Sequence, residues 1–589
     1  MNILDFLTLV GGLALFLYGM EVMSDALKKC AGNQLKTILG NLTSNQFKGF
    51  LLGLAVTCVI QSSSATTVMV VGFVNSGVML LSQAIGVIMG ANVGTAITAW
   101  LTGLSGIGGS GEQAAEFLSY LKPSAWTPIL ALIGICLVMF SKHSKHKDFG
   151  TILLGFSVLM FGMESMSAAV SGLKDDEGFR QLLTAFENPI LGVLAGTIVT
   201  AIVQSSSASV GILQSLTTTG AITYNAAIPI IMGQNIGTCV TALISSFGAT
   251  KNGKRAALAH LYFNIIGVVF WLSILYIVNA FMELPFMQAT IDMWGVAFVH
   301  TIFKLLSVAL IAPFAKYLEK LAVMSVRDSD KKEEYNALDE RLLSTPTIAV
   351  ERSQFVSNVM ANDSINAVKK AISILFDYNK KTAEEINELE GKVDIYEDKI
   401  GTYLVKVCSE DMPKRDSRKA VELLHIINDI ERISDHAINI INSSEEIHSK
   451  SIEFSEEARA ELSVLLGAID EILSITQEAL TQDDTSIAAK VEPLEQVIDG
   501  IITKIRLRHV DRLQKGNCTI ELGFVLTDLL TNFERISDHC SNIAIAMIAV
   551  ENKTFDTHEF LDEIKHEDPE FKRMYHEYKQ KYSLKKLAQ

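Results

Sequence analysis

Two long stretches without a charged side chain constrain what this chain can fold into. The first extends from Gly49 to Gly111 and the second from Asn188 to Thr250, and each is 63 residues long. Since 20% of all residues are Asp, Glu, Lys or Arg, two uncharged stretches of equal length do not arise by chance. Apolar stretches of this length are typical of protein that is embedded in a membrane.

The two uncharged stretches are copies of each other. An offset of 143 residues places the letters Q-S-S-S-A at 61–65 on the same letters at 204–208. The same offset places the pattern G-x-N-x-G-T at 90–95 on the segment 233–238. The match continues without gaps over about a hundred positions, which indicates an internal duplication.

The charge of the chain changes near residue 320. Residues 1–320 have a charge balance of +2, whereas the rest of the chain has a balance of −17. The net charge of −15 would repel a phosphate backbone, so nucleic-acid binding is not expected. The predicted parts are a membrane domain at 1–320 (repeat one at about 5–141, repeat two at about 148–284 and an extra helix at about 293–315), a linker at 321–344, a soluble helical domain at 345–555 and a charged tail at 556–589.

Basic residues of the membrane domain concentrate in alternate loops. Because such loops stay on the cytoplasmic side, we expect the inner (cytoplasmic) membrane, with the N-terminus outside and the acidic domain in the cytoplasm. The loop after the first helix is then internal in repeat one and external in repeat two, so the repeats are predicted to be inverted. The first apolar run, Phe6–Met23, has no basic flank and is expected to be a retained membrane helix. The basic loops are 24–48, 141–147 and 251–255, and the poorly basic loops are 103–124, 171–187 and 281–292.

Each uncharged stretch contains two apolar pieces, at 49–75 and 78–101 in the first copy. The predicted sides of the loops require each stretch to start on one side of the membrane and to end on the other. Two full crossings would return the chain to its starting side, so the first piece is predicted to be a re-entrant hairpin with Q-S-S-S at its tip. Gln61 lies 12 residues into the stretch, which is about 18 Å along a helix and near the middle of a hydrocarbon core of about 30 Å. Asn92 is expected at a similar depth, in a helix that crosses.

Polar backbone at mid-membrane is tolerated only where it is buried in protein or lines a cavity. A broken helix offers N–H groups to an oxyanion at one end and carbonyl groups to a small cation at the other. The alternative is that Ser, Thr and Gly only allow tight helix packing. The recurrence of Gln followed by three serines favours a binding site.

Neither uncharged stretch contains a Lys or Arg that could neutralise an anion. An isolated charge inside a membrane is costly, so the charge that compensates a phosphate-like dianion should be carried by cations. This argument favours cation-coupled symport over a simple anion pore.

The paired QSSS motifs, each followed by G-x-N-x-G-T, resemble the type II sodium/phosphate cotransporters over roughly residues 1–315. The resemblance implies sodium-dependent transport of inorganic phosphate by alternating access, with Na⁺ as the coupling ion. The phosphate- and sodium-binding residues that it implies are Gln61, Ser62, Ser63, Ser64, Thr66, Asn92, Thr95, Gln204, Ser205, Ser206, Ser207, Asn235 and Thr238.

One position departs from this family's pattern. The segments 259–264 and 299–304 both look like its H-x-x-F-N element, but Lys304 stands where Asn is usual. A Lys within the membrane is a functional candidate that would alter the charge stoichiometry. The alternative is a Lys that snorkels to the interface or pairs with a Glu.

The acidic part also repeats. Residues 345–551 show the helical spacing of apolar residues, and the letters E-R-I-S-D-H occur at 431–436 and 534–539, so a unit of about three helices is predicted twice. Carboxylates four residues apart share a helix face and repel unless a cation joins them, and hard divalent or ferric ions accept such ligands. The alternative is a solvated acidic face with Arg432 and Arg535 as partners.

The pattern resembles the PhoU family of phosphate-signalling proteins, which implies metal ligands at Glu431, Asp435, Glu534 and Asp538, with Glu397 and Glu495 as additional candidates.

The prediction is an all-α polytopic membrane transporter with inverted repeats, re-entrant hairpins and broken helices, followed by a soluble tandem three-helix, PhoU-like bundle that regulates it. Its expected partners are inorganic phosphate, sodium and the lipid bilayer, and a homo-oligomer remains open. The rival functions are a membrane phosphate sensor that binds without translocating and a phosphate exporter that uses the same site. No nucleophile–base pair or P-loop signature supports an enzyme.

Overall fold

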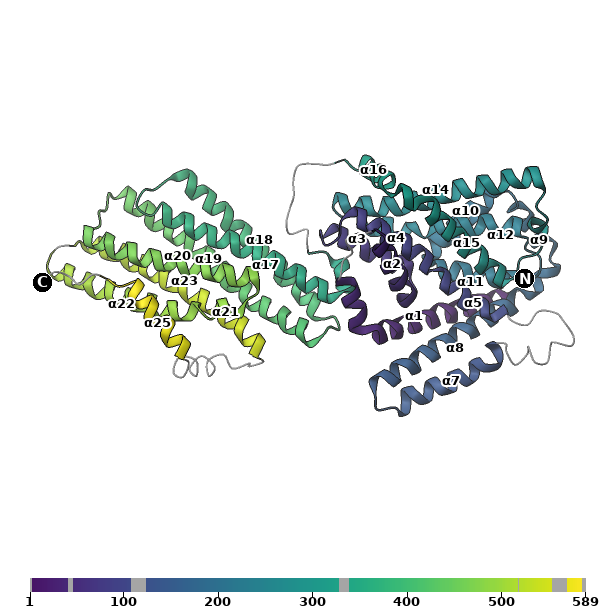
Figure 1. The fold of residues 1–589 in the computed structure, drawn as a ribbon, viewed down its shortest axis with the longest axis horizontal. Helices are drawn as coiled ribbons and strands as arrows, with labels where there is room; N and C mark the ends of the chain where they lie inside the picture. The colour runs from purple at the N-terminus through teal and green to yellow at the C-terminus, as the bar shows by residue number, and fades with distance from the viewer. Residues whose placement is uncertain are drawn as a thin grey trace. The chain divides into compact units, whose positions relative to one another are not determined.

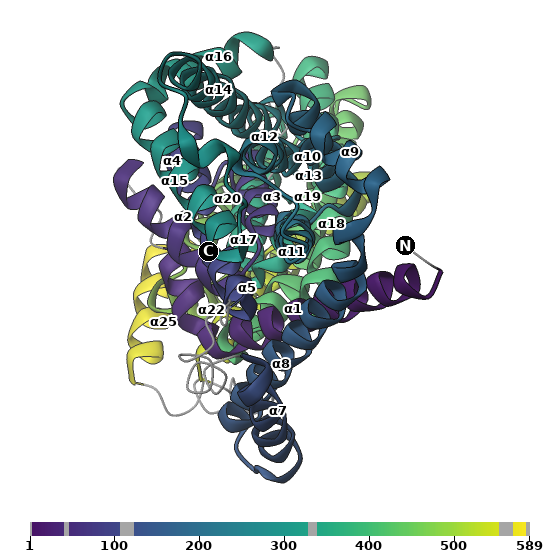
Figure 2. The same ribbon diagram turned by 90° about the vertical axis from the view of Figure 1, so that its right-hand side faces the viewer.

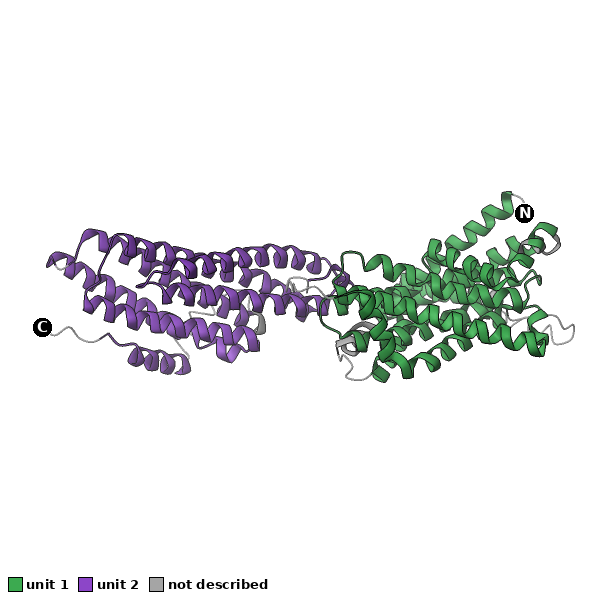
Figure 3. Ribbon diagram, turned by 90° about the horizontal axis from the view of Figure 1, so that it is seen from above, with its two compact units in different colours: residues 1–332 green, residues 333–589 purple. Residues whose placement is uncertain are grey.

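The computed structural model describes residues 3–40, 46–106, 123–327, 338–516, 518–552 and 569–584. The described elements are helices, and one isolated bridge joins Thr223 to Thr290. The chain divides into two compact units, Met1–Lys332 and Glu333–Gln589 (Figure 1 and Figure 3). The all-α fold predicted from the sequence is therefore confirmed.

The first unit contains two matching sets of helices. Four helices of each set begin 143 residues apart, as the sequence repeat requires. The first set is α1 (Ile3–Gly40), α2 (Gln46–Ile60), α3 (Ser63–Asn75), α4 (Leu81–Gly94), α5 (Ala96–Gly103) and α7 (Pro123–Phe140), and the second set is α8 (Ser144–Val170), α9 (Glu177–Ala185), α10 (Pro189–Val203), α11 (Ser206–Thr217), α12 (Tyr224–Gly237), α13 (Cys239–Ser245) and α14 (Lys251–Met282), followed by α15 (Met293–Ile311) and α16 (Ala315–Ser325).

The first helices of the two sets, α1 and α8, run side by side (Figure 1 and Figure 2). Glycines allow their backbones to approach closely: an added Cβ at Gly12 would lie 3.0 Å from the carbonyl oxygen of Gly162, and one at Gly19 would lie 2.6 Å from that of Gly155. The two helices are therefore antiparallel. Because Gly12 is equivalent to Gly155 and Gly19 to Gly162, the contact is symmetrical, which confirms the inverted repeats.

The predicted hairpins are pairs of short helices. Helices α2 and α3 have 15 and 13 residues, and α10 and α11 have 15 and 12. These lengths correspond to about 18–22 Å, which is too short to cross a hydrocarbon core of about 30 Å. Each pair turns back at its Q-S-S-S motif, so the re-entrant hairpins are confirmed.

Among the residues that the structure describes, six helices are long and apolar enough to cross a membrane, or up to seven if one bent pair counts as a span. Two of these spans, Leu81–Gly106 and Tyr224–Ser245, contain the second apolar piece of each copy, as predicted. Both are broken where α4 meets α5 and where α12 meets α13. The bent pair is α9 with α10, which meet at 105°.

The second unit contains two sets of three long helices, so the predicted tandem bundle is confirmed. Helices α19 and α23 carry the two E-R-I-S-D-H segments and pack against each other. A helix that the sequence did not reveal, α25 (Pro569–Lys581), lies within the charged tail and buries Phe571. The two sets are α17 (Pro346–Ser373), α18 (Lys380–Cys408) and α19 (Lys414–Ser449), and then α20 (Glu456–Gln482), the short α21 (Thr485–Ala488), α22 (Val491–Gln514) and α23 (Ile520–Asn552).

Candidate functional site

Both hairpins turn in the same way at their tips. Gln61 has φ = 57° and Gln204 has φ = 55°, in the left-handed region that residues other than glycine seldom adopt. Their backbone N–H groups close the preceding helices by donating to the carbonyl oxygens of Thr57 (2.7 Å) and Thr200 (2.8 Å). The same left-handed residue thus ends the first helix of the hairpin at matched positions of the two repeats.

Ser62 and Ser205 begin the second helix of each hairpin. Each hydroxyl oxygen accepts a hydrogen bond from the backbone N–H three residues later, at Ala65 and Ala208, and both distances are 3.2 Å. This N-cap satisfies one of the unpaired N–H groups of the first helical turn and leaves others at the tip. Each tip therefore presents the positive end of a helix.

A pair of hydroxyls braces each hairpin from within. Thr57 donates to Thr66 Oγ1 at 3.1 Å, and Thr200 donates to Ser209 Oγ at 2.8 Å. Thr66 also donates to the carbonyl oxygen of Ser62 at 3.0 Å. The Thr66 hydroxyl, predicted as a ligand, is thus engaged inside the hairpin and positions the tip.

The remaining serines of the motifs differ from these bracing residues. Within the described part of the chain, the hydroxyls of Ser63, Ser64, Ser206 and Ser207 make no hydrogen bond to a protein atom. Three of them are buried, with Ser63 5%, Ser206 8% and Ser207 7% exposed. A hydroxyl that lacks a partner in the protein is free to bind one from outside, so these hydroxyls are the candidate ligand donors.

The two glutamines have different surroundings. The Oε1 atom of Gln61 accepts a hydrogen bond from Thr98 on α5 at 2.9 Å, and its Nε2 atom donates to the carbonyl oxygen of Cys58. The Gln204 side chain is exposed. The Gln61 side chain therefore connects its hairpin to the broken helix of the same repeat by a hydrogen bond. The two tips differ in this respect, because Gln204 is exposed.

The other predicted ligands lie at the breaks of the crossing helices and are buried. Thr95 and Thr238 mark the breaks, and each hydroxyl donates to the carbonyl oxygen four residues earlier, at 3.1 and 2.9 Å. The Asn92 amide donates to Asn264 on α14 at 3.4 Å, whereas the Asn235 amide donates to the carbonyl oxygen of Ile231 at 2.8 Å.

Each hairpin contacts the broken helix of the opposite repeat. Gln214 on α11 accepts a hydrogen bond from Thr102 on α5 at 2.6 Å and donates to the carbonyl oxygen of Ala99 at 2.9 Å. Helix α3 packs against α13 in the equivalent place. Sequence reasoning missed Gln214. The signal in the sequence was a polar Gln within an apolar helix, at a position where the first repeat has the apolar Val71.

Among the cavities of the described part of the membrane unit are two of about 270 and 260 Å³. The larger one is lined by Glu164, Asp292 and several hydroxyl groups, among them Ser105 and Thr217. The smaller one lies beside Glu187. Neither cavity is lined by a residue of the Q-S-S-S motifs, so the structure does not join the predicted ligands to these two spaces.

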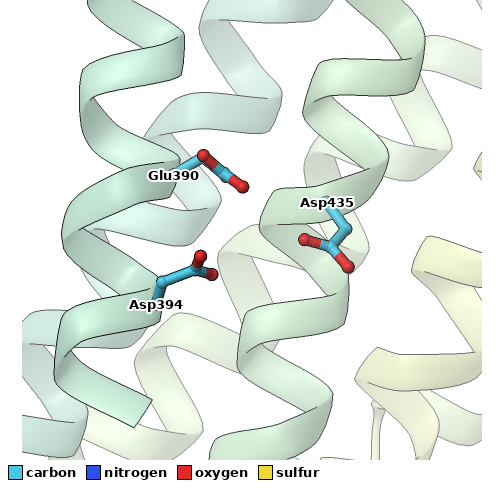
Figure 4. Close-up of side chains that lie close together, drawn as sticks. All are labelled: Glu390, Asp394 and Asp435. Atoms are coloured by element: carbon cyan, nitrogen blue, oxygen red, sulfur yellow. The ribbon is translucent and has the colours of Figure 1, made fainter. Parts of the chain in front are cut away.

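The described part of the second unit contains two groups of three carboxylates. Glu390 and Asp394 on α18 face Asp435 on α19 (Figure 4), with carboxylate oxygens within 4.8 Å of one another. Burial and the charges of Asp394 and Asp435 raise the pKa of Glu390, because each negative charge disfavours another. The equivalent group consists of Glu495, Asp499 and Asp538.

The predicted metal ligands fall only partly in these groups. Asp435, Asp538 and Glu495 belong to them. Glu431, Glu534 and Glu397 do not, and Glu534 instead pairs with Arg506 at 2.5 Å. The alignment of the two sequence repeats made Glu397 the equivalent of Glu495, whereas in the structure Glu390 occupies the equivalent position. Sequence reasoning therefore missed Glu390, Asp394 and Asp499. Their signal was a carboxylate pair four residues apart on one helix.

Comparisons with known proteins agree with this architecture. A family model described as Na⁺/Pi-cotransporter matches residues 15–168 and 158–295, and a PhoU domain model matches 358–444 and 463–547. YqeW of Bacillus subtilis, which is uncharacterized, is 31% identical over 271 residues, covering 46% of this chain and 82% of YqeW. The chain belongs to the Na⁺/Pi-cotransporter family. The two matches to this family model correspond to the two inverted repeats.

Other relatives of this chain carry names that describe phosphate transport. YjbB of Salmonella typhimurium, named for inorganic phosphate export, is 24% identical over 555 residues, which cover 92% of this chain and 98% of YjbB. Sodium-dependent phosphate transport protein 2B of Homo sapiens is 24% identical in an alignment 402 positions long, and the alignment covers 45% of this chain and 58% of that protein.

Proposed function

We propose that this protein transports inorganic phosphate across the cytoplasmic membrane with sodium as the coupling ion, by alternating access between its two inverted repeats. The observation that carries the proposal is the pair of hairpin tips, in which matched serine hydroxyls without a protein partner stand at a helix N-terminus. Backbone N–H groups and hydroxyl donors at such an end suit a phosphate oxyanion.

The sodium part of the proposal rests on charge. The elements that carry the tips and the breaks, α2 to α5 and α10 to α13, lie almost entirely in the two uncharged stretches. A phosphate dianion bound there needs positive charge from elsewhere, and carried Na⁺ ions supply it. Carbonyl oxygens at the breaks and the Asn92 and Asn235 amide oxygens are the ligands that such a cation accepts.

Export is the second candidate function, because the match to YjbB, a protein named for phosphate export, extends over both units. The match to the human protein named for sodium-dependent transport covers 45% of this chain. One site can serve either direction, since alternating access is reversible and the ion gradients set the direction of net flux.

The second unit is proposed to be a cytoplasmic regulatory domain that binds hard divalent or ferric ions at its two carboxylate groups. The supporting observation is the recurrence of three crowded carboxylates at equivalent places, where burial and, after it, mutual repulsion raise the pKa of Glu390 and Asp538. A bound cation would relieve that repulsion.

The transport proposal is tested by phosphate uptake into proteoliposomes with Na⁺ or with choline as the only external cation. We expect rapid uptake in Na⁺ and loss of uptake in choline. A sensor would bind labelled phosphate in detergent without moving it into the vesicles, so binding without flux would replace transport by the sensor function. Equal uptake in choline would contradict sodium coupling.

A further inference from the structure

A lysine lies buried among the membrane helices. Lys304 on α15 is 3% exposed. In the part of the chain that the structure describes, no carboxylate pairs with it and no atom accepts a hydrogen bond from its ammonium group. Neither a snorkelling lysine nor a Glu-paired lysine, the two alternatives left by the sequence, fits this position.

Two buried histidines accompany Lys304. His300 precedes it by one helical turn on the same face of α15, and His260 lies on α14, with exposures of 1% and 2%. The charge of Lys304 acts on both imidazole rings. The Nδ1 atoms of both rings are buried and have no hydrogen-bond partner. Three nitrogen-bearing side chains thus lie in the interior, and one ring nitrogen of each histidine has no hydrogen-bond partner.

This cluster adjoins the broken helix of the proposed transport site. The Asn92 amide on α4 donates to Asn264 Oδ1 at 3.4 Å. The Asn264 amide in turn donates to the carbonyl oxygen of His260 at 3.0 Å and to Cys239 Sγ on α13 at 3.2 Å. A short chain of buried contacts therefore connects the Lys304 cluster with the breaks of both repeats.

Within the described residues, the helices that pack against α15 provide no negative charge for Lys304. Helix α15 packs against α4, α5, α11, α12 and α14. The first four of these helices lie in the two uncharged stretches, and the charged groups of α14 are all basic, namely Lys251, Lys254 and Arg255. The nearest acid on α15 is its N-cap Asp292, which is 12 residues or about 18 Å away and accepts a hydrogen bond from the Gly295 N–H at 2.6 Å. A buried charge without a counter-ion is costly, so an anionic ligand is the natural complement.

We propose that Lys304 is a resident cation of the transport site that takes the place of one coupling Na⁺ per phosphate. The inference rests on the proposed function. The ammonium group contributes one positive charge toward the phosphate dianion, and carried sodium contributes the remainder. The sequence argument that Na⁺ ions must carry all the positive charge that compensates phosphate considers only the two uncharged stretches. Helix α15, with Lys304, lies outside these stretches.

Lys304→Asn is the decisive variant, because it makes the segment 300–304 match H-x-x-F-N at 260–264. We would measure the phosphate accumulation ratio at equilibrium in proteoliposomes held at zero membrane potential with a tenfold Na⁺ gradient. A tenfold gradient of one ion supplies about 1.4 kcal/mol, so each coupled Na⁺ multiplies the ratio by about ten. The variant should therefore reach a ratio about tenfold higher than the wild type, whereas Lys304→Arg, which keeps the charge, should match the wild type.

Lys316→Asn, an exposed change on α16, is the matched control and should leave the ratio unchanged. Equal ratios in the wild type and in Lys304→Asn would overturn the inference. A wild type without sodium-driven accumulation would instead contradict the proposed function, so the two failures are distinguishable.

A binding measurement tests the inference even if the variant binds its ions but does not transport them. Purified protein in detergent is titrated with ²²Na⁺ and ³²P-phosphate, and the bound ions are counted. Lys304→Asn should bind one more Na⁺ per phosphate than the wild type, and an unchanged count would overturn the inference. Lys304→Gln repeats both measurements if the Asn variant does not fold.

Discussion

The Gln214 side chain of the second repeat and the Thr102 hydroxyl of the first repeat are joined by a hydrogen bond of 2.6 Å. Gln214 is fully buried, and its amide also donates to the carbonyl oxygens of Ala99 (2.9 Å) and Met293 (3.0 Å). One side chain thus connects a re-entrant hairpin, the broken helix of the opposite repeat and α15. When one repeat moves against the other, these hydrogen bonds must either break or move together with the helices that they join.

Replacing Gln214 by Leu should destabilise the membrane unit. The change leaves a buried hydroxyl and two carbonyl oxygens with fewer partners, at a cost of about 1–3 kcal/mol per unsatisfied group. The midpoint of thermal unfolding in detergent should fall for Gln214→Leu. The exposed Gln288→Leu is the control and should leave the midpoint in place. Equal midpoints would show that this connection does not contribute to stability.

Ser63→Ala and Ser206→Ala should each weaken phosphate transport. Each change removes a hydroxyl without a protein partner, so the loss falls on the ligand rather than on the fold. A lost buried hydrogen bond of about 1–3 kcal/mol corresponds to roughly a 5- to 150-fold loss of apparent affinity. The measurement is initial uptake below saturation of phosphate and Na⁺.

The double variant tests whether the two tips form one site. If Ser63 and Ser206 share a ligand cluster, the loss in the double variant should be smaller than the sum of the single losses. Strict additivity would indicate separate sites. Ser171→Ala, at the exposed end of α8, is the control and should transport normally.

The Q-S-S-S tips show how far the sequence alone leads. The repeat and the motif predicted the hairpins, the breaks and the candidate ligands, because backbone geometry follows from local signals at fixed spacing. The sequence could not show that Thr66 is engaged with Thr57, that Gln61 reaches Thr98 or that Gln214 contacts the opposite repeat. These partners depend on how distant helices pack.

The carboxylate groups of the second unit illustrate the same limit. The E-R-I-S-D-H motif placed Asp435 and Asp538 on equivalent faces, but the middle long helix of each set, α18 or α22, has diverged too far for its register to be read from letters. Glu390 became recognisable only because α18 lies against α19 (Figure 4). Helix α25 was missed because its charged residues obscure the buried Phe571.

Metal content distinguishes the residues inside the carboxylate groups from those outside. The double variant Asp435→Ala, Asp538→Ala should lose most bound divalent or ferric ion, because it removes one ligand from each group of three. The matched double variant Glu431→Ala, Glu534→Ala should keep its metal. Elemental analysis of purified full-length protein makes the comparison, and equal metal content in both variants would contradict the assignment.

Glu422 should make the second unit less stable as the pH rises. Burial raises the pKa of Glu422 from 4.5 to about 7, although Lys419 lies 2.7 Å from it and opposes the shift. The folded state then binds more protons than the unfolded state between about pH 4.5 and 7, so the free energy of unfolding falls across that window, by at most about 3 kcal/mol. Glu422→Gln should flatten this dependence in unfolding measured from pH 4.5 to 7, and an unchanged slope would contradict the assignment.

The end of the membrane unit also makes a prediction about truncation. Arg255 donates to the carbonyl oxygen of Val326 from two nitrogens, at 3.0 and 2.7 Å, and Tyr262 contacts Ser325 at 2.8 Å. A chain that ends after Lys332 keeps these bonds and should still transport phosphate. A chain that ends after Leu321 loses them and should give less folded protein, as measured by size-exclusion chromatography and uptake. Equal yield and uptake would show that the anchor is dispensable.

The most direct test of the central claim is whether a sodium gradient moves phosphate against its own gradient. Proteoliposomes are loaded with labelled phosphate above the external concentration, and Na⁺ is then added outside or inside at a clamped membrane potential. Sodium-coupled transport predicts net phosphate movement down the Na⁺ gradient and a reversal of direction when that gradient is reversed. Phosphate movement that always follows its own gradient, whatever the direction of the Na⁺ gradient, would contradict the account.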